Sequence, residues 1–157
     1  SNNVMAQQVF LTLSSELGAP GRFEASRLRL SQWWRHGFAG QTEPVLDNGS
    51  GLSRQERISA QALGRLLQNA YVSPVMSELM SSLPISGVDG TLRRTRSRAS
   101  GSAHLKTGTL SNALARAGYV DGASGKRYVL VALVNHANAN AARSALDALV
   151  DWAVNDN

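Results

Sequence analysis

The sequence predicts an α+β fold in which helices come first, three antiparallel strands follow, and one helix closes the chain. Two observations carry this prediction. Residues 4–82 place apolar side chains at helical spacing, whereas residues 104–135 form short β-rich runs separated by a glycine turn. The 157 residues suffice for one domain with a core, and neither an internal repeat nor a low-complexity linker divides them.

Four helices are expected in the first half of the chain. They are expected over Val4–Leu17, Arg22–His36, a segment that follows Ser59, and Ser73–Ser82. Asn2 or Asn3 suits the cap of the first helix, and Gly37 suits the end of the second. The side chains expected to face inward are Phe23, Leu28, Leu30, Trp33 and Trp34 in the second helix and Leu63, Leu66, Leu67 and Ala70 in the third.

Glycine turns punctuate the remaining chain. NGSG at 48–51 needs backbone angles that glycine and asparagine adopt at low cost, and SGVDGTL at 86–92 is expected to be another turn region that contains glycines. Strands are expected over 104–109, 113–121 and 126–135, the last two joined as a hairpin by residues 121–126. The closing helix is expected over 138–154, with Leu146, Leu149, Val150, Trp152 and Ala153 on its apolar side.

Composition excludes several classes of function. The chain has no cysteine, so disulfides and cysteine chemistry are excluded, and its longest apolar run, Tyr128–Val134, is too short to span a bilayer. The net charge of +5 favours an acidic partner, which could be nucleic acid, an anionic lipid or an anionic polymer such as a cell wall. The basic run at 93–98 has no interleaved aromatic residues, so we expect a solvated loop there and no nucleic-acid partner.

The segment HLKTGTLSN, residues 104–112, carries the strongest chemical signal. Only two of the 16 basic residues are lysines, and one of them, Lys106, precedes Thr107 and Gly108 in this predicted strand. A lysine ammonium is a compact cation that binds a carboxylate or favours deprotonation of a nearby hydroxyl. A bare glycine lets a ligand approach the backbone, whose N–H groups can stabilise an oxyanion. By itself, however, this tripeptide is weak evidence, and a solvated lysine at a strand end is the favoured interpretation without further support.

A second motif supports the chemical interpretation. Ser1-Asn2-Asn3 is a Ser-x-Asn that precedes a helix, and Ser-x-Asn followed by Lys-Thr-Gly is the motif order of penicillin-reactive serine enzymes. VLDNGSGLSR, SLPISGVDGTL, HLKTGTLSN and ARAGYVD then follow in order between Val45 and Asp121. In this order the chain resembles the D-alanyl-D-alanine carboxypeptidase/endopeptidases, the low-molecular-mass class C penicillin-binding proteins.

The resemblance implies a role for each matching residue. Ser1 is similar to the hydroxyl that relays a proton to the leaving group, and Asn3 to the amide that orients the substrate backbone. Lys106 resembles the lysine that holds the Ser1 hydroxyl. Thr107 and Thr109 are expected to bind the terminal carboxylate of the peptide beside Gly108, and the Thr109 N–H to contact the oxyanion. The resemblance implies a periplasmic enzyme that needs no metal or cofactor, and that acts on peptidoglycan stem peptides and reacts with β-lactams through an acyl-enzyme.

The family's nucleophile motif, Ser-x-x-Lys, is absent from these residues. Ala103 and Ala123 stand three positions before the two lysines. We therefore expect residues 1–157 to be the C-terminal part of one penicillin-binding domain with the transpeptidase-like fold, inactive alone, whose N-terminal part supplies the nucleophile. A three-stranded sheet without that part should leave a strand edge unpaired.

Other functions remain open at this point. A non-catalytic module that binds wall peptides or a protein partner, and a β-lactamase or esterase on the same fold, are the alternatives. An N-terminal serine nucleophile at Ser1 is disfavoured because Ser1 heads a helix. The three histidines are scattered without metal-ligand spacing, and His104 is expected at the cleft entrance or in solvent.

Overall fold

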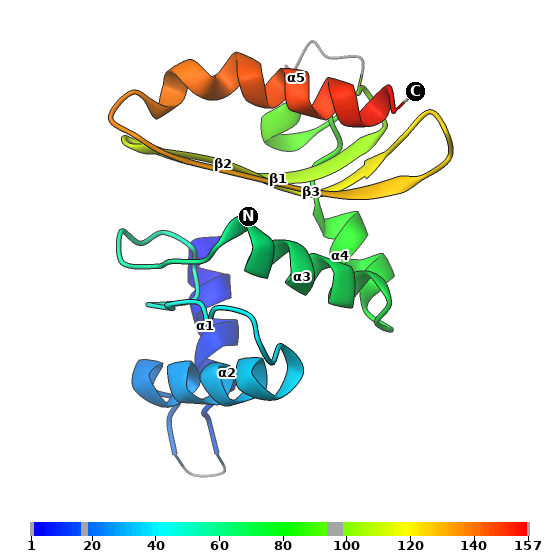
Figure 1. Ribbon diagram of the computed structural model, residues 1–157. Coiled ribbons are helices and arrows are strands. Elements are labelled where there is room, and N and C mark those ends of the chain that lie inside the picture. Colours follow the sequence, from blue (N-terminus) through cyan, green and yellow to red (C-terminus); the bar gives the residue numbers. More distant parts are fainter. Residues whose placement is uncertain (1, 17–18, 94–98, 157) are drawn as a thin grey trace. The chain divides into compact units, whose positions relative to one another are not determined.

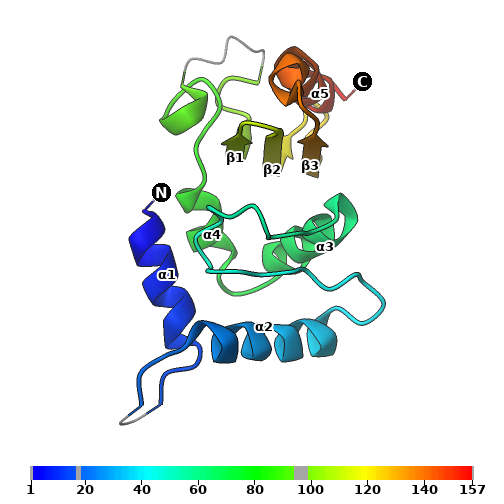
Figure 2. The same cartoon turned by 90° about the vertical axis from the view of Figure 1, so that its left-hand side faces the viewer.

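A computed structural model describes residues 2–16, 19–93 and 99–156. The chain divides into two compact units, Ser1–Ala62 and Leu63–Asn157, each of which is described by itself. Figures 1 and 2 show helices and loops in the first unit and a sheet with helices in the second, so the predicted α+β class is confirmed. No helix within the described ranges is long and apolar enough to cross a membrane.

The first unit is built on α1 (Asn3–Thr12) and α2 (Phe23–Gly37). The Asn2 side chain accepts a hydrogen bond from the Met5 N–H at 3.0 Å, so Asn2 is the predicted cap. The prediction that the first helix reaches Leu17 is wrong, because α1 ends at Thr12. After it the Ser14 hydroxyl bonds to the Ser26 hydroxyl at 2.8 Å, and this contact directs the chain back toward α2.

The core of this unit is smaller than the apolar pattern predicts. Trp34 is 3% exposed and stacks on Phe38 with ring centroids 4.5 Å apart. Phe10 is also buried, against the backbone of Gly49. The prediction of inward side chains is wrong for three positions of α2 within the described residues, since the exposed members are Phe23, Leu28 and Trp33. Helical spacing identifies an apolar residue but not whether another element covers it.

The NGSG turn has the predicted backbone at its glycines, because Gly49 and Gly51 have φ values of 75° and 73°. Asn48 contributes through its side chain instead, which accepts a hydrogen bond from the Ser50 N–H at 3.0 Å. An isolated antiparallel bridge between Val45 and Arg57 closes the loop around this turn.

Three helical segments lead to the sheet: α3 (Ala60–Tyr71), α4 (Met76–Ser82) and the 3₁₀ turn η1 (Gly90–Leu92). The Ser59 hydroxyl accepts from the Ala62 N–H at 3.0 Å and starts α3 as predicted. Leu67 of α3 is buried, as predicted. The helix α4 begins at Met76, three residues later than the predicted Ser73.

The sheet has the predicted meander order, β1 (Ala103–Leu110), β2 (Ala113–Asp121) and β3 (Arg127–Asn135), all antiparallel. The 3₁₀ turn η2 (Ala139–Ala142) leads into α5 (Arg143–Val154), which packs on one face of the sheet (Figure 1). Leu105, Val120 and Leu130 meet Val150 in this core. Leu149 and Trp152 of α5 were expected on its apolar side but are 37% and 74% exposed.

The opposite face of the sheet contacts α3. The buried Tyr119 hydroxyl donates to the Leu67 carbonyl at 2.8 Å, and Arg127 lies over the Tyr71 ring at 5.6 Å. Among the described residues β3 pairs only with β2, so its outer edge is unpaired there.

Candidate active site

Strand β1 directs the Lys-Thr-Gly side chains to two faces. Alternation and the pairing of His104 with Tyr119 put His104 and Lys106 on the α3 face, and Leu105 and Thr107 on the α5 face. Lys106 is exposed, and its Nζ atom donates to the Thr107 carbonyl at 2.5 Å. The ammonium group therefore turns toward the outer edge of β1.

This outer edge is half covered. The Ser86 N–H donates to the Ala103 carbonyl at 2.8 Å, and the Leu105 N–H donates to the Pro84 carbonyl at 2.9 Å. Because alternate residues of a strand present their backbone groups to the same edge, the N–H groups of Thr107 and Thr109 also point outward. Within the described parts of the chain neither has a backbone partner. An extended peptide can pair with this edge.

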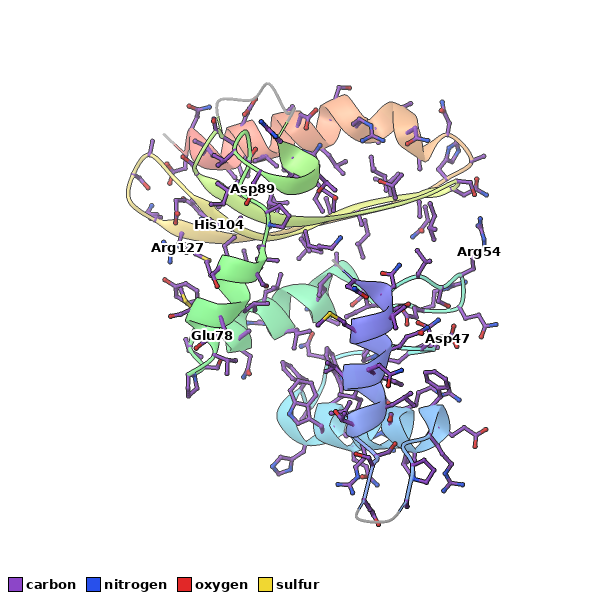
Figure 3. All side chains as sticks on the ribbon, turned by 180° about the vertical axis from the view of Figure 1, so that it is seen from behind. Asp47, Arg54, Glu78, Asp89, His104 and Arg127 are labelled. Carbon is purple, nitrogen blue, oxygen red and sulfur yellow. The ribbon has the colours of Figure 1, made fainter. Side chains whose placement is uncertain are left out.

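The Ser86–Leu92 turn forms the wall beside the edge. Gly87 and Gly90 have φ values of 71° and 52° in this segment, which the sequence predicted to be a turn. Asp89, labelled in Figure 3, accepts a hydrogen bond from the Ile85 N–H at 2.6 Å. Leu92 is 3% exposed and anchors the turn in the core.

Thr91 of this turn reaches the Lys-Thr-Gly motif. Its Oγ1 atom lies 2.8 Å from Oγ1 of Thr107. The sequence prediction missed this pair, because the two threonines are 16 positions apart in the sequence and no local pattern indicates that they meet. The only local signal is that Thr91 directly follows Gly90, in a glycine-containing turn that precedes the motif strand in the sequence.

An ion pair with a buried arginine lies behind the same part of β1. Arg116 of β2 is the register partner of Thr107, is 6% exposed, and donates to the Asp147 carboxylate of α5. A buried guanidinium needs such a partner to offset the loss of hydration. The pair fixes β2 to α5 at the level of the motif.

His104 is half-buried on the α3 face, two residues before Lys106 (Figure 3). Its Nδ1 atom is buried and has no hydrogen-bond partner among the described groups. Within residues 2–16, 19–93 and 99–156, no three histidine, aspartate or glutamate side chains lie close enough to hold a metal ion.

The Ser-x-Asn motif belongs to the other unit. Ser1 lies outside the described residues, as do Arg94–Arg98 of the predicted basic loop. Asn3 is the exposed first residue of α1, whereas Asn2 uses its side chain as the helix cap. Lys106, Thr107, Gly108 and Thr109 are contiguous on β1, but their meeting with Ser1 and Asn3 stays a prediction.

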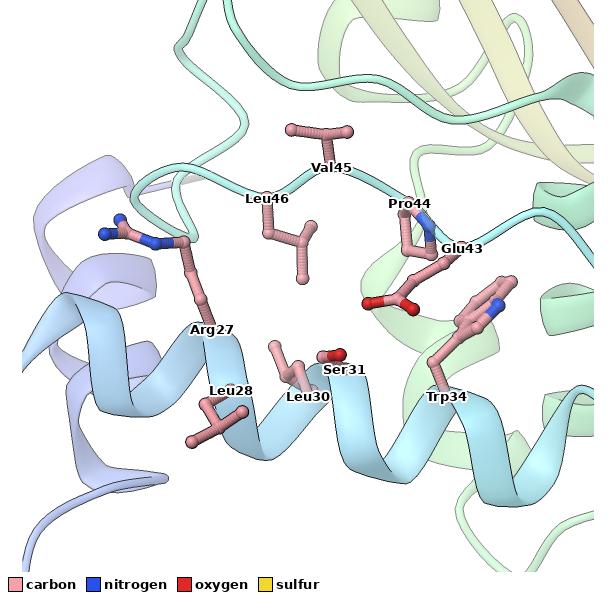
Figure 4. Close-up of a pocket in the computed structure, with 9 residues that line it drawn as sticks. All are labelled: Arg27, Leu28, Leu30, Ser31, Trp34, Glu43, Pro44, Val45 and Leu46. Atoms are coloured by element: carbon pink, nitrogen blue, oxygen red, sulfur yellow. The ribbon is translucent and has the colours of Figure 1, made fainter.

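A pocket of about 410 Å³ lies in the first unit, between α2 and the segment 43–46 (Figure 4). Its walls are largely apolar, and the Glu43 carboxylate points into it near Ser31. Hydrogen bonds from Ser31 and then from Arg35, whose Nε lies 2.7 Å away, hold the pKa of Glu43 below its usual value. None of the predicted site residues lines this pocket, so we assign it no part in the candidate site.

Comparison with known proteins agrees with the family resemblance that the motifs indicate. Residues 1–156 match the D-Ala-D-Ala carboxypeptidase 3 (S13) family. The chain is 33% identical over 158 residues to carboxypeptidase DacB of Mycolicibacterium smegmatis, covering 95% of this chain and 34% of the relative. It is 30% identical over 153 residues to a D-alanyl-D-alanine carboxypeptidase of Actinomadura sp., covering 93% of this chain and 28% of the relative. The chain thus spans about a third of the length of these relatives.

Solved structures share its fold. Penicillin-binding protein 4 of Haemophilus influenzae, in complex with a β-lactam, aligns with a TM-score of 0.76 at 24% identity over 85% of this chain and 32% of that one. A predatory endopeptidase of Bdellovibrio bacteriovorus aligns with a TM-score of 0.80 at 17% identity over 100% of this chain and 43% of that one. At these identities the likeness shows the fold.

Proposed function

The chain belongs to the D-Ala-D-Ala carboxypeptidase 3 (S13) family of low-molecular-mass penicillin-binding proteins, and we propose that it supplies two of the three motifs of a serine-type peptidase. The substrate is a peptidoglycan stem peptide that ends in D-Ala-D-Ala. The third motif, the Ser-x-x-Lys nucleophile, comes from a segment outside residues 1–157. The protein acts in the periplasm, where peptidoglycan lies.

The free half of the β1 edge is the observation that carries this proposal. A stem peptide in extended form pairs with the outward N–H groups of Thr107 and Thr109. The Lys106 ammonium, turned toward that edge, supplies positive potential for the terminal carboxylate. The Thr107 and Thr109 hydroxyls donate to the same carboxylate, and the Thr109 N–H stabilises the oxyanion.

The reaction proceeds in two steps. The nucleophilic serine attacks the carbonyl carbon of the penultimate D-alanine, and its proton passes to lysine. The C–N bond breaks, the Ser1 hydroxyl relays a proton to the departing amine, and D-alanine leaves. Water then attacks the acyl-enzyme ester, which restores the serine and releases the shortened peptide with a new carboxylate. A β-lactam follows the first step, as its ring amide opens to an acyl-enzyme.

Peptide products test this proposal. The protein that combines this chain with the Ser-x-x-Lys segment is incubated with a pentapeptide ending in D-Ala-D-Ala and with a cross-linked muropeptide dimer. Chromatography should show release of D-alanine, cleavage of the dimer, or both, and penicillin should block either reaction. Absence of both reactions, with no covalent penicillin adduct by mass spectrometry, would contradict the proposal.

A non-catalytic binding module is the second candidate for the chain alone, because these residues contain no Ser-x-x-Lys. The same assay separates the two functions. If the protein is a binding module, it should bind the peptide and leave it uncleaved, even in the form that also contains the Ser-x-x-Lys segment.

A further inference from the structure

We propose that Thr91 is a positioning residue for the carboxylate subsite, acting through the hydroxyl of Thr107. This inference rests on the proposed function and adds to it a residue outside the three motifs. The main observation for it is the 2.8 Å distance between Oγ1 of Thr91 and Oγ1 of Thr107.

The Ser86–Leu92 turn holds Thr91 in a fixed place. The Gly87 N–H donates to the Leu92 carbonyl at 3.1 Å, and Leu92 is buried directly after Thr91. A Cβ atom on Gly87 would lie 2.4 Å from Oγ of Ser100, and the φ of 71° also disfavours any other residue. The turn is also bonded to β1 through the Ser86 N–H and the Ala103 carbonyl. Thr91 therefore contacts Thr107 from a segment that is hydrogen-bonded to the same edge of β1.

The order of donors follows from the charge of the ligand. Each hydroxyl has one proton to donate and lone pairs to accept with. When a carboxylate binds, the Thr107 proton is drawn to it, so the Thr91 proton is donated to Oγ1 of Thr107. Such a chain of hydrogen bonds strengthens its terminal member and holds the Thr107 side chain in one rotamer. The hydrogen bond from Thr91 to Thr107 thus favours ligands with a free carboxylate, namely peptides with an unmodified C-terminus and penicillins that are not esterified.

Paired penicillins test the role of Thr91. Acylation rates are measured in the protein that combines this chain with the Ser-x-x-Lys segment, using benzylpenicillin and its methyl ester. Thr91→Val keeps the shape of the side chain but removes the hydroxyl. We expect acylation by benzylpenicillin to fall about five- to tenfold, in line with one lost hydrogen bond, and acylation by the ester to change less than twofold. Thr91→Ser should restore the rate with benzylpenicillin.

The control is Thr42→Val, an exposed threonine of the first unit, which should leave both rates unchanged. Equal losses with benzylpenicillin and its ester, or a wild-type rate in Thr91→Val, would overturn the positioning role while leaving the proposed function intact. No acylation of the unchanged protein by either compound would refute the proposed function, and this inference with it.

Discussion

The ion pair behind the motif strand, whose arginine is buried, gives a prediction with a definite size. Arg116 has a side chain that is 7% exposed, and that of its partner Asp147 is 36% exposed. Asp147→Ala leaves a guanidinium charge in the core, a change that typically costs about 3–5 kcal/mol. Because water reaches the Asp147 side, we expect the lower end, about 3 kcal/mol. With a urea slope of about 2 kcal/mol per molar, the unfolding midpoint should fall by about 1.5 M.

Two further variants isolate the cause. Arg116→Met removes the charge and keeps much of the volume, so the double variant with Asp147→Ala should recover at least half of the loss. The exposed pair Arg29–Glu16, at 3.5 Å, is the matched control, and Glu16→Ala should shift stability by less than about 0.5 kcal/mol. Circular dichroism in urea measures all four proteins. A loss below 1 kcal/mol in Asp147→Ala, or no recovery in the double variant, would refute the burial argument.

Two other predictions concern the sheet. Hydrogen bonds from the hydroxyls of Ser124 and Tyr128 lower the pKa of Asp156 from 3.8 to about 2, so the stability it contributes is present above pH 3.8 and lost as the pH falls toward 2. In urea titrations, Asp156→Asn should remove that part of the pH dependence, and an unchanged acid profile would contradict it. Gly118→Ala should lower the thermal midpoint strongly, because its Cβ would lie 2.1 Å from the His104 carbonyl oxygen; a midpoint within 2 °C of the unchanged protein would speak against this close approach.

The sheet was largely predictable from the sequence because its strands pair with their neighbours along the chain. Residues 113–121 and 127–135 are β-rich runs joined by a short glycine turn, and such a turn determines both partner and direction. The cap at Asn2 and the glycines of the NGSG turn follow from equally local chemistry.

The errors fall where a distant contact decides the outcome. The exposure of Trp33 and Trp152 depends on which elements cover them, and helical spacing carries no such information. The contact between Thr91 and Thr107 joins residues 16 positions apart, and no local pattern indicates it. The roles of Ser1 and Asn3 came from resemblance to a family, and they stay predictions.

Covalent labelling by a fluorescent penicillin tests the central claim most directly, namely that Lys106 belongs to an acyl-transfer site. In the protein that combines this chain with its Ser-x-x-Lys segment, Lys106→Ala should lower the labelling rate on the order of a hundredfold, as expected for loss of a positioned charge. Lys126→Ala removes the chain's other lysine, in the hairpin between β2 and β3, and should label at the unchanged rate. Equal labelling of the two variants, or a protein that never labels, would contradict the account.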